Sequence, residues 1–224
     1  LVGVGAGAGE YTNNYTTKLY NKVLNHEYFH SVRDERSKIY VEKELGLKAI
    51  NTGCVTMWML TPEFCKSIPK KKADAAIITL TARPELNLNE QKMIDIVKKN
   101  YSKVYCWIQG DLDLDYYNKF KNTDGIQLIP PNKDAYEHIL NTEDLDYIGT
   151  RLHGGIYAMR HKKRAIIIAI DERAKEIHKG NNLNCLSINE IDQLDELINS
   201  EIETKVSMPF DEIERWKSQF EEYK

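Results

Sequence analysis

The sequence predicts an α/β protein in which helices cover both faces of a parallel sheet. Apolar, β-branched runs alternate with amphipathic helical segments along most of the chain, which is the order of repeated βαβ units. Runs such as AAIITLT and RAIIIAI are predominantly apolar and do not alternate, as in strands buried on both faces. Ligands bind beyond the carboxyl ends of such strands, so these exits are where a site is expected.

The expected elements follow from hydrophobic periodicity and capping signals. Strands are expected near residues 1–6, 29–32, 75–81, 103–109, 126–129, 146–150 and 165–170. Helices are expected near residues 14–25, 34–45, 88–99, 113–120, 133–141, from about 154, and 172–179. Asn87 or Asn89 is a candidate cap of the third helix, and Asp134 of the fifth.

The stretch from Pro62 through Pro69 is charged and lacks periodicity, which predicts a domain boundary. We expect an N-terminal domain over residues 1–66, a C-terminal domain over 67–206, and a final helix over 207–224. Because Leu1 opens inside a strand-like stretch, the first domain is expected to be incomplete. The final helix has a candidate cap at Asp211 and presents one apolar face. The members of that face are Phe210, Ile213, Trp216 and Phe220.

Composition narrows the class of function. A 42% apolar content supports a buried core, and the longest apolar run is far below the ~20 residues of a transmembrane helix. A net charge of −3 argues against nucleic-acid binding. Four scattered cysteines without a C-x-x-C pair indicate neither zinc nor disulfides, and favour the cytoplasm. DLDLDYY lacks the glycine and distal glutamate of a calcium loop, so no metal and no cofactor is expected.

Arginine is concentrated at the predicted strand exits. Of eight arginines, four follow a predicted strand closely, whereas most lysines lie on helix faces. These four are Arg33, Arg83, Arg151 and Arg173. The guanidinium fork binds carboxylate and phosphate oxygens bidentately. An acidic protein with arginines at its strand exits therefore indicates a small polyanionic ligand.

The segment TRLHGG is the first candidate site. Arg151 and His153 follow a strand, and Gly154 and Gly155 open a helix, where backbone N–H groups can approach an anion. The alternative is structural, with Arg151 paired to a carboxylate and His153 packed at a turn.

Two further junctions carry charged residues with either a ligand or a local role. In SVRDERS, Ser31 and Asp34 fit a capping box, so one of them is expected to begin the helix. Arg33, Asp34 and Ser37 are candidate substrate-binding residues there, and Arg36 has no assigned role. In IIAIDERAKEI, Asp171 is a candidate helix cap or ribose-binding carboxylate, and Arg173 a candidate substrate-binding residue. The role of Arg83 stays open.

These motifs resemble the polysaccharide pyruvyl transferase family in order and spacing. SVRDERS, NTGCVTMWML and DYIGTRLHGGIYAMRHKKRAIIIAIDERAKEI carry the resemblance, which covers roughly residues 1–180. One departure is Val55, which stands where the family often has proline. The resemblance implies a GT-B-like fold of two Rossmann-like domains, with the final helix returning to the first domain.

The resemblance also implies a reaction. A pyruvyl group would pass from phosphoenolpyruvate to a sugar, as a ketal across two hydroxyls, in cell-surface polysaccharide biosynthesis. The acceptor would be a saccharide or a lipid-linked oligosaccharide. Arg151 and Arg33 would bind the donor with Gly154 and Gly155, and His153 would be the general acid or base.

Two alternatives remain at the level of sequence. One is a GT-B glycosyltransferase that uses a nucleotide sugar, since a fold alone does not fix the chemistry. The other is a family member that binds saccharide without catalysing a reaction. A titration with phosphoenolpyruvate, UDP and UDP-sugars distinguishes them.

Overall fold

The computed structural model describes residues 1–6, 13–170 and 180–221. The chain forms two compact units. Leu1–Met59 and Met208–Lys224 make the smaller unit, and Leu60–Ser207 makes the larger one. The smaller unit is therefore assembled from both ends of the chain, whereas the larger unit is one continuous segment.

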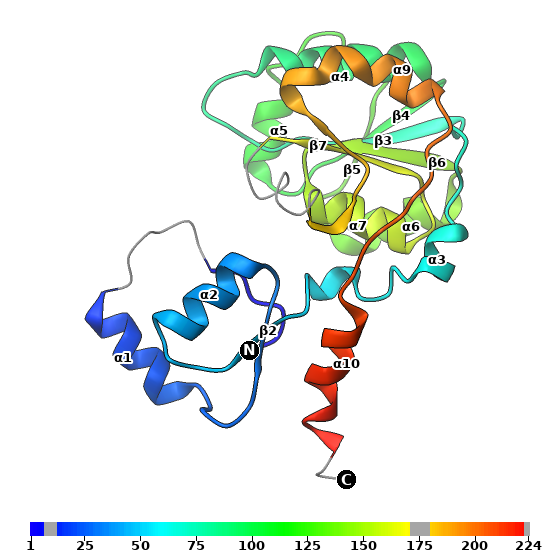
Figure 1. Ribbon diagram of the computed structural model, residues 1–224. Helices are drawn as coiled ribbons and strands as arrows, with labels where there is room; N and C mark the ends of the chain where they lie inside the picture. Colours follow the sequence, from blue (N-terminus) through cyan, green and yellow to red (C-terminus); the bar gives the residue numbers. More distant parts are fainter. Residues whose placement is uncertain (7–12, 171–179, 222–224) are drawn as a thin grey trace. The chain divides into compact units, whose positions relative to one another are not determined.

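The larger unit contains a six-stranded sheet whose neighbouring strands are all parallel (Figure 1). The strands are β3 (Ala75–Thr79), β4 (Lys103–Trp107), β5 (Gln127–Ile129), β6 (Leu145–Gly149), β7 (Ala165–Ala169) and β8 (Cys185–Ser187). Their order across the sheet is β5-β4-β3-β6-β7-β8. The predicted parallel α/β architecture is confirmed for this unit, although strand β8 was not predicted.

Helices pack on both faces of this sheet, as expected. The larger unit contains the helices α3 (Pro62–Lys66), α4 (Leu88–Asn100), α5 (Asp111–Tyr117), α6 (Lys133–Thr142), α7 (Leu152–Arg160) and α9 (Leu194–Asn199), with the 3-10 helix η2 (Ile188–Gln193). Figure 1 shows α4 and α9 on one face and α6 and α7 on the other. Asn87 caps α4, as predicted, by accepting from Asn89 N. The predicted cap of α6 is wrong: Asn132, not Asp134, accepts from Ala135 N at 2.7 Å.

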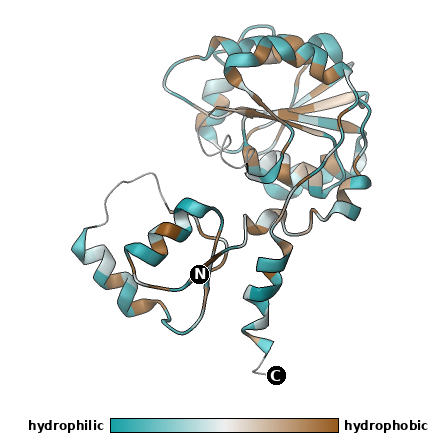
Figure 2. Ribbon diagram, viewed as in Figure 1, coloured by the Kyte–Doolittle hydropathy of each residue, from teal (hydrophilic) through white to brown (hydrophobic). Residues whose placement is uncertain are grey.

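Apolar burial explains why these strands lie at the centre. Every residue of β3, β6 and β7 is buried. On one face Ile78, Ile148 and Ile168 pack in one cluster with Met93 and Ile94 of α4, and none of these five is measurably exposed. Each such side chain contributes about 1.5–3 kcal/mol on burial. In Figure 2 the central strands are accordingly mostly brown, while the helices alternate between teal and brown.

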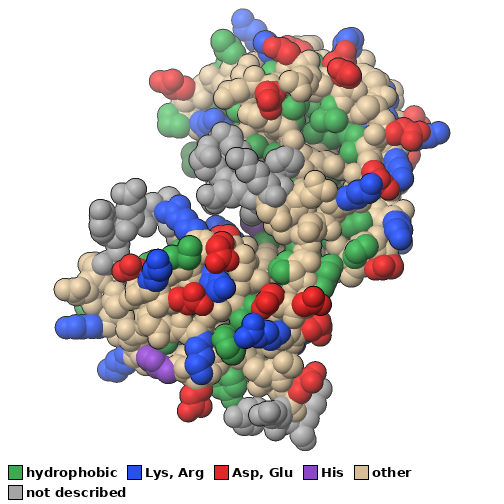
Figure 3. Space-filling view, viewed as in Figure 1, with side chains coloured by type: hydrophobic (Ala, Val, Ile, Leu, Met, Phe, Trp, Pro, Cys, Tyr) green, Lys and Arg blue, Asp and Glu red, His purple; other side chains and the backbone are tan. Residues whose placement is uncertain are grey.

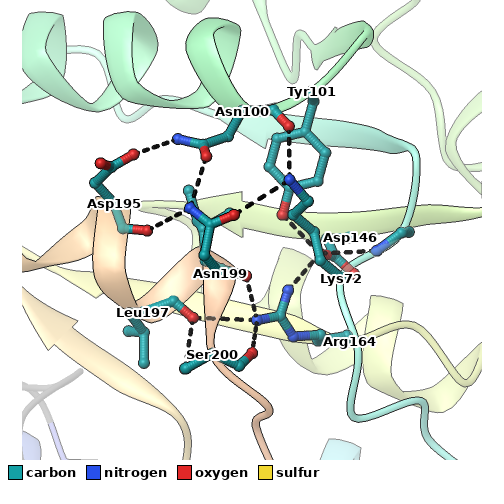
Figure 4. Close-up of polar contacts among 11 residues, drawn as sticks. Lys72, Asn100, Tyr101, Asp146, Arg164, Asp195, Leu197, Asn199 and Ser200 are labelled. Atoms are coloured by element: carbon teal, nitrogen blue, oxygen red, sulfur yellow. Dashed lines mark hydrogen bonds and ion pairs between the residues drawn. The ribbon is translucent and has the colours of Figure 1, made fainter.

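A buried polar network closes the amino ends of the strands (Figure 4). Asp146 accepts from Arg164 Nη1 and from the Tyr101 hydroxyl, each at 2.6 Å. Nη2 of Arg164 donates to three carbonyls of α9 and its end, at 2.8–3.1 Å: Leu197, Ile198 and Ser200. Burial raises the pKa of Asp146, and the donors and charge around it oppose that rise. The network joins two strands to the helices over one face.

The segment after Met59 belongs to the larger unit. Leu60, Cys65 and Ile68 are buried, and the backbone N–H of Ile202 donates to Lys70 O at 2.9 Å. The residues from Leu60 to Lys72 therefore run along the larger unit before β3 begins.

The smaller unit is built on two short parallel strands, which pair in register from His30–Ala49 to Val32–Asn51. Its elements are α1 (Asn14–Val23), β1 (His30–Val32), α2 (Glu35–Lys43), β2 (Ala49–Asn51), the 3-10 helix η1 (Val55–Met57) and α10 (Phe210–Ser218). The strand expected over residues 1–6 is reduced to a single bridge between Val4 and Val32. Strand β2 was not predicted.

Helix α10 packs within the smaller unit. Ile213 and Trp216 are buried, and the indole N–H of Trp216 donates to Phe29 O at 2.8 Å. The Trp216 ring also meets Trp58 edge-on, with centroids 5.8 Å apart. The predicted cap is wrong: Pro209 precedes the helix without a capping side chain, and Asp211 lies in the first turn.

The surface of the larger unit carries charges of both signs. On the face in view, acidic and basic side chains are interspersed with small apolar areas (Figure 3). Within the described ranges, every helix is too short or too polar to traverse a lipid bilayer.

Candidate active site

The order of the strands creates a switch point between β3 and β6. From β3 the chain first adds β4 and β5 on one side, and then crosses back to add β6, β7 and β8 on the other. Open α/β sheets bind ligands at such a point, beyond the carboxyl ends of the two strands. Here the segments that leave β3 and β6 are LTARP and TRLHGG. TRLHGG, the first predicted site, therefore lies where the topology favours binding.

Hydroxyl groups fix the backbone between β6 and α7. The Tyr147 hydroxyl donates to Arg151 O at 2.6 Å, and lies 2.5 Å from Thr79 Oγ1. A phenol has one O–H, so the Thr79 hydroxyl donates to the phenol oxygen. Thr79 also accepts from the backbone N–H of Arg151 at 3.3 Å. Thr150 adds a bond from its own N–H to Thr79 O. The turn that carries Arg151 is thus hydrogen-bonded to the end of the neighbouring strand.

One edge of the Arg151 guanidinium is bound within the protein. Its Nε donates to Leu80 O at 3.0 Å, and its Nη2 donates to Asp113 Oδ1 at 2.6 Å. A guanidinium has five N–H groups, and the three not used by these bonds have no acceptor in the part of the chain that the structure describes. The Arg151 side chain is 32% exposed. The sequence raised a structural alternative in which Arg151 pairs with a carboxylate. That pair is present, but it leaves most of the guanidinium N–H groups available to a ligand.

Asp113 is a residue of this edge that the sequence did not reveal. It lies in the first turn of α5 and is 4% exposed. Its carboxylate accepts from the backbone N–H groups of Ala82 and Gln109, each at 3.2 Å, as well as from Arg151. The stretch DLDLDYY forms the whole of α5. The spacing of its three carboxylates does not reveal which one turns inward.

The first turn of α7 lies directly after Arg151. His153 is exposed there, and the N-cap residue Arg151 contributes no side-chain cap to the turn. The amide groups that open a helix have no intrahelical acceptor and favour anions. A cation and the positive end of a nine-residue helix are therefore adjacent at this edge.

The two glycines of TRLHGG have a packing role. A Cβ added at Gly155 would lie 2.8 Å from both Ile167 Cγ1 and Tyr147 Cε1, and one at Gly154 would lie 3.1 Å from the Tyr147 hydroxyl. The backbone N–H of Gly155 already donates to Arg151 O at 3.1 Å. The Gly155 amide is therefore already used within the helix, and a role of Gly154 and Gly155 in substrate binding stays a prediction. The glycines let α7 approach the sheet closely.

The candidate residues of the smaller unit are joined to one another. Asp34 is the N-cap of α2, as one reading of SVRDERS predicted, and accepts from Ser37 N at 2.7 Å. Its other oxygen lies 3.3 Å from Arg33 Nε. Ser37 Oγ accepts from Ala6 N at 2.8 Å. The Arg33 guanidinium rests against Gly5, where an added Cβ would overlap it. A role of Arg33, Asp34 and Ser37 in substrate binding stays a prediction.

The remaining candidates are less informative. Asp171 and Arg173 lie outside the described residues. Arg36 is exposed on α2, and Arg83 is half-buried beyond β3. The charge of Arg83 opposes the rise that burial imposes on the pKa of Glu90. Among the residues that the structure describes, no group of three or more His, Cys, Asp or Glu side chains is arranged to hold a metal ion.

The comparison with protein families identifies this chain. The model of one family, the polysaccharide pyruvyl transferases, matches residues 1–172. The chain belongs to the polysaccharide pyruvyl transferase family. The matched range contains Arg33, Asp113, Arg151 and His153, and ends shortly after β7. No curated protein matches the chain in sequence.

Membership of the polysaccharide pyruvyl transferase family indicates a transferase of polysaccharide biosynthesis with a saccharide acceptor. The range matched by the family model also contains the switch point of the sheet. Arg151 and His153 lie in the matched range, at the carboxyl edge where an α/β sheet binds its ligand.

Proposed function

We propose that this protein transfers a pyruvyl group from phosphoenolpyruvate to a pair of sugar hydroxyls, forming a ketal in a cell-surface polysaccharide. The observation that carries the proposal is the half-occupied guanidinium of Arg151 at the switch point, in a chain of this family. Phosphoenolpyruvate carries a carboxylate and a phosphate, and both match the geometry of a guanidinium fork.

Arg151 is the main donor-binding residue in this proposal. Its Nε and Nη2 share the edge that faces Leu80 and Asp113, which leaves the end formed by Nη1 and the second N–H of Nη2. That end can form two parallel bonds to one carboxylate or phosphate. The opening turn of α7 adds a favourable dipole for the same anion. Arg33, Asp34 and Ser37 of the smaller unit and Arg173 are the further substrate-binding candidates, as the family resemblance implies.

His153 is the proposed general acid or base. The reaction requires one sugar hydroxyl to add to C2 of the donor while the methylene carbon gains a proton. A second hydroxyl then displaces phosphate from C2, which completes the ketal and releases the second hydroxyl proton. An imidazole can carry either proton near neutral pH. His153 is exposed in the turn that follows Arg151, where it can reach a bound donor.

The wider setting of the reaction is also proposed. The two units would correspond to the Rossmann-like halves of a GT-B-like enzyme, acting in the cytoplasm on a saccharide or a lipid-linked oligosaccharide. The six-stranded parallel sheet of the larger unit supports a Rossmann-like half. The family supports the saccharide acceptor.

A thermal-shift titration tests the donor. Only a ligand that binds the native state raises its stability, so phosphoenolpyruvate is expected to raise Tm while UDP and UDP-sugars leave it unchanged. A rise with UDP-sugars alone would support a nucleotide-sugar transferase instead. A response to oligosaccharide but to neither donor would support a non-catalytic saccharide-binding protein.

Product analysis tests the reaction. Mass spectrometry of candidate acceptors incubated with phosphoenolpyruvate is expected to show addition of one pyruvyl ketal and release of phosphate. His153→Ala is expected to abolish this product while phosphoenolpyruvate still raises Tm. Unchanged turnover in His153→Ala would remove the imidazole from the mechanism.

A further inference from the structure

The carboxylate of Asp113 joins the ends of three strands. Oδ1 accepts from Ala82 N, which follows β3, and from Arg151, which follows β6; Oδ2 accepts from Gln109 N, which follows β4. The side chain of Asp113 is 6% exposed, so these bonds are almost shielded from water. Such charge-assisted bonds are roughly twice as strong as neutral ones. The position of the carboxylate is therefore fixed by the sheet itself.

We propose that Asp113 is the positioning residue that holds the Arg151 guanidinium in the orientation that binds the donor. This inference rests on the proposed function and deepens it. Asp113 does not touch the donor; it acts through Arg151.

The physical reason is the loss of rotational freedom. Two acceptors, Leu80 O and Asp113 Oδ1, lie on the same edge of the guanidinium and fix both its plane and its direction. A free arginine side chain would lose this freedom only when it binds a ligand. Fixing it beforehand lowers that entropic cost of binding and sets the angle at which a carboxylate or phosphate must approach.

If Asp113 acted on the donor only through its charge, it would weaken donor binding instead of strengthening it. A buried carboxylate 2.6 Å from the guanidinium lowers the positive charge that an anionic donor meets. If Asp113 acted only through its charge, its removal would tighten donor binding. If it positions Arg151, its removal weakens binding. The direction of the change therefore distinguishes the two.

Asp113→Asn is the variant that tests the proposal. The amide keeps the shape of the side chain and one acceptor oxygen, but loses the charge and the second acceptor. Isothermal titration with phosphoenolpyruvate is expected to give a Kd about ten- to a hundredfold higher than wild type. Unchanged or tighter binding would overturn the proposal. Asp111→Asn and Asp115→Asn, at exposed positions of the same helix, are the matched controls and should bind as wild type.

A double-mutant cycle tests whether Asp113 acts through Arg151. In an Arg151→Lys background, Asp113→Asn is expected to cause little further loss of phosphoenolpyruvate binding, because the bidentate fork is already absent. Additive losses in the cycle would mean that Asp113 acts independently of Arg151, which contradicts the proposal.

A ligand-free measurement separates this proposal from the proposed function. In 15N NMR spectra of the wild-type protein, the Arg151 Nη protons are expected to give separate signals, because a held guanidinium rotates slowly. Arg151→Lys identifies these signals by their loss. Averaged Nη signals in the wild type would overturn the positioning role, whatever the donor is and whether or not Asp113→Asn folds. Resolved signals in a protein that does not bind phosphoenolpyruvate would instead contradict the proposed function alone.

Discussion

Two arginine–aspartate pairs lie at opposite edges of the same sheet, and their geometry at the point of contact is alike. Arg151–Asp113 at the carboxyl edge and Arg164–Asp146 at the amino edge both have an N–O distance of 2.6 Å. Their surroundings differ. The side chains are 32% and 6% exposed in the first pair, but 1% and 2% in the second.

The difference shows how one pair of residue types serves two purposes. Arg164 directs its Nη groups at one carboxylate and three carbonyls, and its Nε is buried without a partner in the described chain. With 1% of its side chain exposed, it is not accessible to a ligand. Arg151 directs one edge at the protein and keeps the other end exposed. Burial and the number of acceptors, rather than the pair itself, separate a structural arginine from one that can bind a ligand.

The largest expected effect is at the amino edge. Arg164→Met leaves Asp146 buried without its cation, and removal of one partner of a buried pair costs about 3–5 kcal/mol. Denaturant unfolding should show this loss of unfolding free energy. Lys92→Ala, which removes an exposed partner of Asp192, is the control and should unfold as wild type. A loss no greater than that control would mean that the network does not stabilise the fold.

The next effect tests the packing role of the glycines. Gly155→Ala places a Cβ 2.8 Å from Ile167 and Tyr147, and overpacking of this kind costs about 1–3 kcal/mol. The fraction that folds should still bind phosphoenolpyruvate, since the Gly155 amide bonds to Arg151 O. Gly110→Ala is the steric control, because beyond the two neighbouring residues no atom of the described chain lies within 4 Å of its added Cβ. If Gly155→Ala loses donor binding while its stability is unchanged, Gly155 takes part in donor binding.

A smaller loss of stability is expected at the carboxyl edge. Arg151→Met should lower the unfolding free energy by about 1–2 kcal/mol, because Asp113 keeps its two backbone donors. The same variant should abolish the thermal shift caused by phosphoenolpyruvate. If Arg151→Met is as destabilising as Arg164→Met, the two pairs contribute equally to the fold and do not differ in role.

The smallest effect concerns a buried carboxylate without a direct ionic partner. Glu90 accepts from the Tyr116 hydroxyl, but its Oε1 has no hydrogen-bond partner within the described chain. Burial raises the pKa of Glu90 above its usual value of 4.5. The folded protein then keeps a proton that the unfolded chain has released, so this group makes the unfolding free energy fall as pH rises above 4.5.

Glu90→Gln should remove this pH dependence. The variant is expected to be at least as stable as wild type at neutral pH, and the gain should vanish below pH 4.5. Chemical unfolding at several pH values measures it. A variant that is less stable at neutral pH would show that the charge of Glu90 is compensated in the native state.

Sequence patterns predicted the long elements and part of the site. Uninterrupted apolar runs identified β3 and β7, and TRLHGG placed Arg151 and His153 at a strand exit. Strands β2 and β8 were not predicted, whereas the equally short β1 and β5 were. A three-residue run has no readable period, so only the pattern around it can reveal such a strand.

Tertiary contacts explain what the sequence did not reveal. Asp113 is indistinguishable in pattern from Asp111 and Asp115, and only the packing of α5 selects it. Arg164 carried no signal either, because a charged side chain is expected at the surface until its partners are known.

The origin of the smaller unit from both ends of the chain affects how the protein folds. Its Trp216 docks on Phe29, which lies 187 positions earlier in the sequence. During synthesis the ribosome delivers the whole of Leu60–Ser207 before this tryptophan emerges. The larger unit can therefore fold first. The smaller unit, which contains β1 and β2, is complete only once α10 has been synthesised. A deletion near residue 210 would consequently disturb strands that lie far earlier in the chain, not the segment beside the deletion.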